Sequence, residues 1–279
     1  MAIEAKRKQM VVRQVPAVSR AVAILRFLAR SHQPVGVVQI ASALGIIPST
    51  GLHILRVLHS EGLASFDPVS KKYQLGAGVL TLANEFASKN SLVQVVRPFL
   101  EQISHRHRCT AVAVEPSGPD YYIAIAAASG NQGMPVRVNV GTRLPTMVSA
   151  TGRCLAAYGN WSLAELKRRF AKLRWENAPS FETWHAEVEE TRRRGYGLDV
   201  GNYIRGITIV AVPILTGEEA VVGALVAVKV TDQLGTEEEK MLAEELKLAA
   251  SRVRAQLGYA LRDDAPEPVP VRPRRRAGG

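Results

Sequence analysis

The first third of the chain carries apolar residues at helical spacing in successive runs. Six of them recur every three or four positions and predict an amphipathic helix: Val18, Ala21, Val22, Leu25, Leu28 and Ala29. A second run, Val38–Gly62, predicts two short helices joined by a tight turn. We expect Gly45 to end the first helix with a positive φ, and Ser49 or Thr50 to cap the second. This pattern is typical of a helix-turn-helix.

The second helix of this pair has two different faces. Its apolar side holds Ile54, Leu55 and Leu58. The opposite side collects hydrogen-bond donors and no acidic residue: Ser49, His53, Arg56 and Ser60. Such a face suits the phosphates and base edges of a DNA major groove. The alternative is an ordinary helical hairpin with a solvated polar face.

A β-hairpin is predicted directly after this motif, in the segment Leu63–Gly76. Two short β-prone runs flank a turn signal at Asp67–Ser70, and Lys71 and Lys72 follow at the tip. Lysines held there are expected to reach a DNA phosphate. Alternatively, they only keep an edge strand soluble. The sequence therefore predicts a winged helix-turn-helix domain over residues 16–77.

Residues 78–91 predict a linker helix with an apolar face of its own. That face consists of Val79, Leu80, Leu82, Ala83, Phe86 and Ala87. We expect it to pack against a second subunit, because dimeric helix-turn-helix proteins need such a contact to bind two half-sites. The helical pattern that follows is expected to kink or restart at Pro98.

From Cys109 onward, strand and helix patterns alternate. Strands are expected at Ala111–Val114, Tyr121–Ala127, Pro135–Val140, 207–214 and 220–230, and helices at 149–158, Ser162–Leu173, Phe181–Arg194 and Thr236–Leu257. Residues 194–206 are rich in glycine and predict a loop. The expected fold class is α+β, with a second domain over residues 92–260 built as an α/β unit with a mostly antiparallel sheet.

Charge is distributed unevenly along the 279 residues. Residues 1–90 hold eleven basic and four acidic side chains, a formal net charge of +7 out of +11 for the whole chain. The positive potential therefore belongs to the predicted helix-turn-helix, which favours double-stranded DNA as its partner.

The terminal segments and the small number of cysteines predict a cytoplasmic protein. Residues 1–15 predict a flexible basic arm without the apolar run of a signal peptide, and residues 261–279 a disordered tail rich in proline and arginine. No stretch approaches about twenty uninterrupted apolar residues, so we expect no membrane partner. Cys109 and Cys154 are too few for a disulfide framework. We expect no cofactor.

Six segments together resemble the IclR family of bacterial transcriptional regulators. They are VSRAVAILRFL, GIIPSTGLHILRVLHSEGL, KKYQLG, GTRLPTMVSATGRCLAAY, RRRGYGLDVGNYIRGITIVAVPI and VVGALVAVKV, in this order between Val18 and Leu257. The resemblance implies an N-terminal winged helix and a C-terminal GAF-like effector-binding domain. It also implies homodimers or homotetramers that repress or activate promoters.

The resemblance carries over to the predicted recognition helix with one departure. The family's pattern has a polar aromatic residue or His and then Arg, where this chain has Leu52 and His53. Loss of that Arg removes a bidentate guanidinium contact to guanine. The predicted DNA contacts are Ser49, Thr50 and His53 from the motif, Arg56 from helix geometry, and Lys71 and Lys72 from the wing.

The resemblance also implies an effector site in the second domain. The matching positions are Val136, Ala150, Thr151, Asp199, Ile209, Val226 and Val228. Some relatives carry a Cys and serines where this chain has Ile209, Val226 and Val228. An apolar lining disfavours a small, fully polar acid, so we expect a partly apolar or aromatic effector bearing a carboxylate or ester. The alternative is that these residues are ordinary core.

Three other functions compete with a ligand-responsive regulator. A sequence-neutral DNA-binding protein would use only the basic arm and tail. A thiol hydrolase would combine Cys154 with His185 and Asp199, although no nucleophile-elbow or oxyanion motif is recognisable. A metal site would need His105, His107 and Cys109, but residues two apart do not share a helical face. We therefore expect neither catalysis nor a metal.

Overall fold

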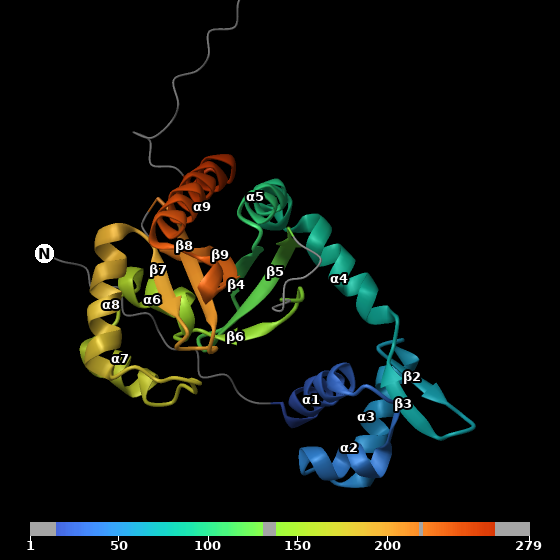
Figure 1. Cartoon of the computed structure of the whole chain (residues 1–279). Helices are drawn as coiled ribbons and strands as arrows, with labels where there is room; N and C mark the ends of the chain where they lie inside the picture. The colour runs from blue at the N-terminus through green and yellow to red at the C-terminus, as the bar shows by residue number, and fades with distance from the viewer. Residues whose placement is uncertain (1–14, 131–137, 218–219, 260–279) are drawn as a thin grey trace, which may run out of the picture. The chain divides into compact units, whose positions relative to one another are not determined.

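The computed structural model describes residues 15–130, 138–217 and 220–259 (Figure 1). The chain divides into two compact units, residues 1–89 and 90–279. Residues 1–14 and the tail from 260 lie outside the described residues, so almost all of the predicted arm and the whole predicted tail do too. In the described part, no single helix is long and apolar enough to cross a membrane.

The N-terminal unit is a winged helix. Its elements are α1 (Pro16–Arg30), β1 (Val35–Gly36), α2 (Val37–Leu44), α3 (Pro48–Ser60), β2 (Ala64–Asp67), β3 (Lys72–Leu75) and α4 (Gly78–Lys89). The described strands pair in the order β1-β3-β2, and all the pairings are antiparallel. A core of apolar side chains from α1, α2, α3 and the strands holds the unit together.

The turn between α2 and α3 follows the predicted pattern except at the cap. Gly45 ends α2 with φ +64°, a left-handed conformation that glycine adopts without steric cost. The predicted cap at Ser49 or Thr50 is wrong, because α3 already begins at Pro48 with Ile47 in the cap position. Proline suits the first helical position, where its missing N–H needs no partner. Helices α2 and α3 together would be long and apolar enough to cross a membrane, but the pair is bent by 113°.

The buried stripe of α1 differs in part from the predicted one. Ile24 is fully buried and Leu28 nearly so, whereas Val18 and Val22 are exposed. Positions 21, 24, 25 and 28 form the stripe that faces the core, at spacings of three, four and seven. The sequence pattern chose a neighbouring set because apolar residues surround much of this helix.

The C-terminal unit is a six-stranded antiparallel sheet, within the described residues, between two layers of helices. The strands are β4 (Thr110–Pro116), β5 (Tyr121–Ser129), β6 (Arg143–Pro145), β7 (Gly197–Val200), β8 (Ile207–Leu215) and β9 (Val221–Val230), in the order β6-β5-β4-β9-β8-β7. The helices are α5 (Ser91–His107), α6 (Ser149–Tyr158), α7 (Leu163–Phe170), α8 (Phe181–Arg194), the short η1 (Thr231–Gln233) and α9 (Thr236–Gln256). This confirms the predicted fold class.

The two faces of the sheet carry separate cores. Helices α5 and α9 cover one face (Figure 1), and their Val96, Leu100 and Leu246 are fully or almost fully buried. Helix α6 covers the other face, where alternate residues of β4, β8 and β9 point. Helices α7 and α8 pack outside α6 around the fully buried Trp184.

Three predicted details of this unit are wrong. The third strand lies at Arg143–Pro145, and the described part of Pro135–Val140 is not a strand. Part of the predicted glycine-rich loop is the edge strand β7, because pairing with β8 outweighs its local turn composition. A restart of the helix at Pro98 is also wrong, because α5 is one helix from Ser91 to His107 and buried side chains on both sides of that proline pack on the sheet.

Candidate functional site

The recognition helix α3 presents a polar face without a carboxylate. Ser49, His53 and Arg56 are exposed, while Leu55 and Leu58 anchor the opposite side in the core. Thr50 is half-buried. The apolar anchors fix the rotation of the helix, so the three exposed side chains are held outward together.

A histidine that the sequence pattern did not single out ties α3 to the wing. The Nδ1 atom of His59 lies 3.2 Å from the carbonyl oxygen of Ala64, at the start of β2. Its ring also packs against the edge of Phe66, with 6.3 Å between centroids. The side chain of His59 therefore joins the end of the helix to the hairpin.

The tip of the wing is a hydrogen-bonded turn that carries two lysines. The carboxylate of Asp67 accepts hydrogen bonds from the hydroxyl of Ser70 and from the amides of Val69 (3.0 Å) and Ser70 (3.2 Å). These bonds, that of the Ser70 hydroxyl first, lower the pKa of Asp67. Lys71 adopts φ +56°, and both Lys71 and Lys72 are exposed. The hydrogen-bonded turn thus holds the backbone of Lys71 and Lys72 in a defined conformation.

In the C-terminal unit, an apolar cavity of about 70 Å³ lies between the sheet and the start of α6. Its lining is Val112, Val114, Val138, Leu144, Pro145, Val148, Ser149, Thr151, Tyr203, Ile204, Ile209, Val226 and Val228. Strand register explains how these residues meet: Val112 pairs with Val226, and Ile209 pairs with Val228. Their side chains therefore project from the same face of the sheet.

The predicted effector residues fall into three groups. Thr151, Ile209, Val226 and Val228 line this apolar cavity. Ala150 and Asp199 are buried nearby without lining it, and Val136 lies outside the described residues. The sequence reasoning missed most of the lining from β4 and from the loop after β7, because only the paired sheet brings those segments to α6.

A fully buried guanidinium belongs to α6, the helix that also supplies Ser149 and Thr151 to the cavity lining. Arg153 of α6 has 0% exposure and donates to Asp199 (Nη1 to Oδ2, 2.9 Å), to Glu187 (Nε to Oε2, 2.8 Å) and to the side-chain oxygen of Asn202 (2.9 Å). Asp199 is itself fully buried. A sequence signal existed: this arginine is the one charged residue in the helix SATGRCLAAY.

The Arg153 network positions part of the cavity wall. The other carboxylate oxygen of Asp199 accepts the backbone amides of Asn202 (3.1 Å) and Tyr203 (3.2 Å). Tyr203 and the adjacent Ile204 line the cavity. Asp199 does not line the cavity, but it holds the backbone of the loop that supplies Tyr203 and Ile204 to the lining.

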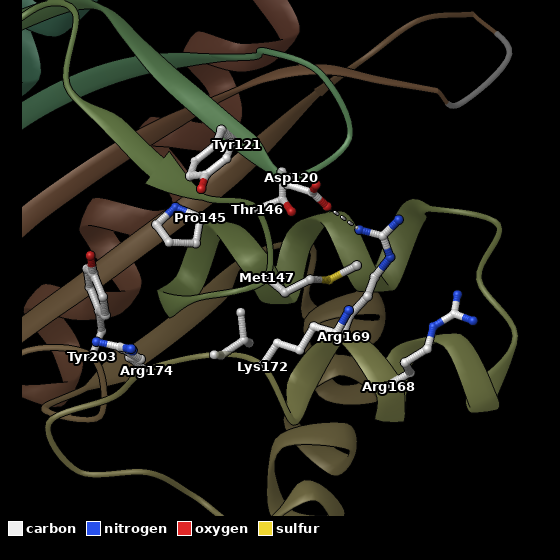
Figure 2. Close-up of a pocket in the computed structure, with 11 residues that line it drawn as sticks. Asp120, Tyr121, Pro145, Thr146, Met147, Arg168, Arg169, Lys172, Arg174 and Tyr203 are labelled. Atoms are coloured by element: carbon white, nitrogen blue, oxygen red, sulfur yellow. Dashed lines mark hydrogen bonds and ion pairs between the residues drawn. The ribbon is translucent and has the colours of Figure 1, made fainter. Parts of the chain in front are cut away.

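A larger, basic cleft of about 660 Å³ lies beside the apolar cavity. Its lining is Asp120, Tyr121, Pro145, Thr146, Met147, Arg168, Arg169, Lys172, Leu173, Arg174 and Tyr203. Figure 2 shows Arg168, Arg169, Lys172 and Arg174 on one side and the end of β6 on the other. Pro145 and Tyr203 line both spaces.

Comparison with known families decides between the possible functions. Residues 17–68 match the IclR helix-turn-helix domain, and residues 84–255 match the C-terminal domain of the bacterial transcriptional regulator IclR. The second match alone covers more than half of the chain. The chain belongs to the IclR family of bacterial transcriptional regulators.

Relatives of this IclR-family chain match over most of its length. An IclR transcriptional regulator from Alicyclobacillus acidocaldarius is 29% identical, and the match covers 87% of this chain and 98% of that one with a TM-score of 0.78. The HTH-type regulator RhmR of Escherichia coli is 28% identical over 88% of this chain and 95% of its own. The glycerol operon regulatory protein of Streptomyces coelicolor is 28% identical, with 76% and 84% covered. The protein is therefore a DNA-binding transcriptional regulator.

The three residues of the alternative thiol triad have other partners in this IclR-family structure. The Cys154 thiol donates to the carbonyl of Ala211 (3.2 Å), the ring of His185 packs on Phe181, and Asp199 is bound by Arg153. Among the described residues, no group of three or more His, Cys, Asp or Glu side chains is placed to hold a metal ion.

The two thiols are expected to be inert in the native protein. Burial, the largest effect at each site, raises the pKa of both Cys109 and Cys154 to about 12. At pH 8 this leaves roughly a thousandfold less thiolate than in a free cysteine. Ellman's reagent should therefore modify two thiols per chain in denaturant and react far more slowly in buffer. Rapid labelling of one native thiol would instead reopen the thiol-hydrolase hypothesis.

Proposed function

We propose that this IclR-family regulator binds operator DNA through α3 and the wing, and that a small effector bound beside α6 changes its operator affinity. The observation that carries the DNA part is the exposed, carboxylate-free face of α3. Ser49, His53 and Arg56 would meet base edges and phosphates, with Thr50 at the margin. Lys71 and Lys72 would bind backbone phosphates from the wing.

The effector is proposed to be a partly apolar or aromatic organic acid. Valine, isoleucine and leucine side chains dominate the cavity, and Ser149, Thr151 and Tyr203 are the lining residues with hydroxyl groups. Burying a fully polar ligand among these side chains would leave its oxygens unpaired. The volume of about 70 Å³ is small, so an aromatic ligand would have to widen the cavity or extend from it.

A homodimer or homotetramer is part of the proposal. Leu82 and Phe86 of α4 are exposed although they are apolar, and their four-residue spacing places them on one face of the helix. A second subunit that covers this face would pair two recognition helices for two half-sites. As its target is DNA, we place the regulator in the cytoplasm of a bacterial cell.

The decisive experiment compares the affinity for the intergenic DNA upstream of the regulator's own gene with that for random DNA of equal length. Both affinities are measured across a salt series, with and without each member of a panel of aromatic and aliphatic acids. The panel includes 4-hydroxybenzoate, which is bound in the structure of an IclR homolog from Microbacterium hydrocarbonoxydans. Specific binding that one compound shifts supports the proposal. Affinity that falls equally with salt for every duplex, with no ligand effect, supports a sequence-neutral binder instead.

Replacing Arg56 by alanine should weaken operator binding by about 1–3 kcal/mol, because a donor on the exposed face of α3 is lost. The affinity of this variant for random DNA should change less than its affinity for the operator. Arg193→Ala is the matched control, since this exposed arginine lies on α8 and pairs with Glu190. Lys72→Ala should instead weaken all duplexes alike and reduce the salt slope by about one. Unchanged operator binding by Arg56→Ala would show that another face meets the DNA.

A further inference from the structure

The basic cleft holds more positive charge than its own carboxylate neutralises. Four cations line it, and Asp120 is the one acidic residue among the described lining residues. Asp120 is already bound: Nη1 of Arg169 lies 3.1 Å from its Oδ1 (Figure 2). The same Nη1 reaches the carbonyl of Pro119 at 3.3 Å, and the Arg169 guanidinium lies 4.5 Å from the ring centroid of Trp161. Arg169 is thus a fixed part of the wall.

The remaining three cations are weakly paired. Arg168 comes no nearer than 3.8 Å to Glu165, at the limit of an ion pair. Lys172 and Arg174 have no carboxylate partner among the described residues. The three side chains come from α7 and the segment after it, and Figure 2 shows them along one wall, with Arg174 beside Tyr203 at one end of the cleft and Arg168 at the other. Their mutual repulsion costs free energy that a bound anion would remove.

The size and walls of the cleft suit a small molecule. Its volume of about 660 Å³ falls within the range of about 300–1,000 Å³ found for small-molecule sites. Tyr121 and Tyr203 add aromatic surface, and Thr146 adds a hydroxyl group. Burial and then the charge of Glu176 raise the pKa of Tyr203, so its phenol remains a neutral hydrogen-bond donor.

We propose that the basic cleft binds a small organic anion with two or more negative charges, carried by carboxylate or phosphate groups. A single carboxylate would leave positive charge uncompensated, whereas a dianion or trianion matches Arg168, Lys172 and Arg174. Arginine forks bind such groups through two parallel hydrogen bonds, and lysine adds a point charge. This inference does not depend on the DNA-binding proposal.

The anion has two possible sources, because Pro145 and Tyr203 border both the cleft and the apolar cavity. It is either the acidic end of an effector whose apolar part enters the cavity, or a separate ligand that occupies the cleft alone. The chemistry recognised by the three cations is the same in both cases.

The test is calorimetric titration of the full-length protein with pyrophosphate and with citrate, at constant ionic strength, with acetate as the monoanionic comparison. We expect both polyanions to bind at one site per chain that the double variant Lys172→Ala/Arg174→Ala weakens about tenfold or more per cation removed. Arg193→Ala/Lys240→Ala removes the same charge from exposed pairs elsewhere and should leave the affinity unchanged. Both double variants change exposed side chains, so both should fold.

Phenyl phosphate and inorganic phosphate distinguish the two sources. Tighter binding of phenyl phosphate, lost when Val226→Phe fills the cavity, identifies the acidic end of an effector. Equal binding of the two identifies a separate anion site. The proposal is wrong if neither polyanion binds, or if the Lys172/Arg174 variant binds them as well as its control. It is also wrong if that variant instead reduces the salt slope of DNA binding, because the cleft would then contact phosphates of the duplex.

Discussion

Arg153→Met should destabilise the C-terminal unit by about 3–5 kcal/mol, the largest loss that we expect from one substitution in this protein. Methionine retains much of the side chain's apolar volume but removes every hydrogen bond to Asp199, Glu187 and Asn202. Asp199 has 0% side-chain exposure and would lose its only cationic partner among the described residues, with two backbone amides left as donors. Glu187 is 38% exposed and can be hydrated, so Asp199 should account for most of the loss.

The fluorescence of tryptophan reports this unit selectively. The chain has three tryptophans, Trp161, Trp175 and Trp184, and all belong to the C-terminal unit. The ring centroid of Trp175 lies 5.9 Å from the Arg153 guanidinium. Urea unfolding followed by tryptophan emission should therefore show a lower midpoint for Arg153→Met with an unchanged slope.

Two further variants separate the network from general damage. Arg193→Met removes an arginine that is 75% exposed and should change the free energy of unfolding by less than about 1 kcal/mol. Arg153→Met/Asp199→Asn removes the stranded charge while the amide oxygen still accepts from the loop, so it should recover part of the loss. If Arg153→Met is as stable as the parent, the buried ion pair does not hold the unit together.

An element of this fold can be predicted from the sequence when the residues that determine it lie close together along the chain. The helix-turn-helix and the wing follow from residues within a few positions of each other, such as Gly45 in its left-handed turn and Asp67 at the hairpin. Strand β7 carries glycine-rich turn chemistry, and only its pairing with β8 makes it a strand. Local composition could not show that pairing.

The candidate sites divide in the same way. The face of α3 follows from helical periodicity, because one helix supplies all of it. The apolar cavity joins segments as distant as Val112 and Val228, and only sheet register brings them together. The basic cleft has a visible signal in LKRRFAKLR, but basic residues at this spacing are equally typical of the solvated side of an amphipathic helix. Its concavity arises only when this segment lies against the end of β6.

Leu55→Ala should remove specific DNA binding while leaving the C-terminal unit folded. Leu55 has 0% exposure and lies on α3 opposite the proposed DNA face, in a core formed only by the small N-terminal unit. Truncating such a side chain costs about 2–5 kcal/mol, a large share of the total stability of a small domain. The tryptophan transition in urea should stay at the parent's midpoint, because no tryptophan lies in residues 1–89.

Val57→Ala is the matched control for this experiment, because Val57 lies on the same helix and is 60% exposed. It should change the stability by about 0.5 kcal/mol or less and keep its operator affinity. Far-UV circular dichroism should show partial loss of helix at a lower temperature for Leu55→Ala, before the tryptophan signal changes. Phenyl phosphate should still bind that variant, since its proposed site belongs to the C-terminal unit. If the tryptophan transition falls together with the helical signal, the two units unfold as one, and the recognition helix depends for its stability on the domain that binds the ligand.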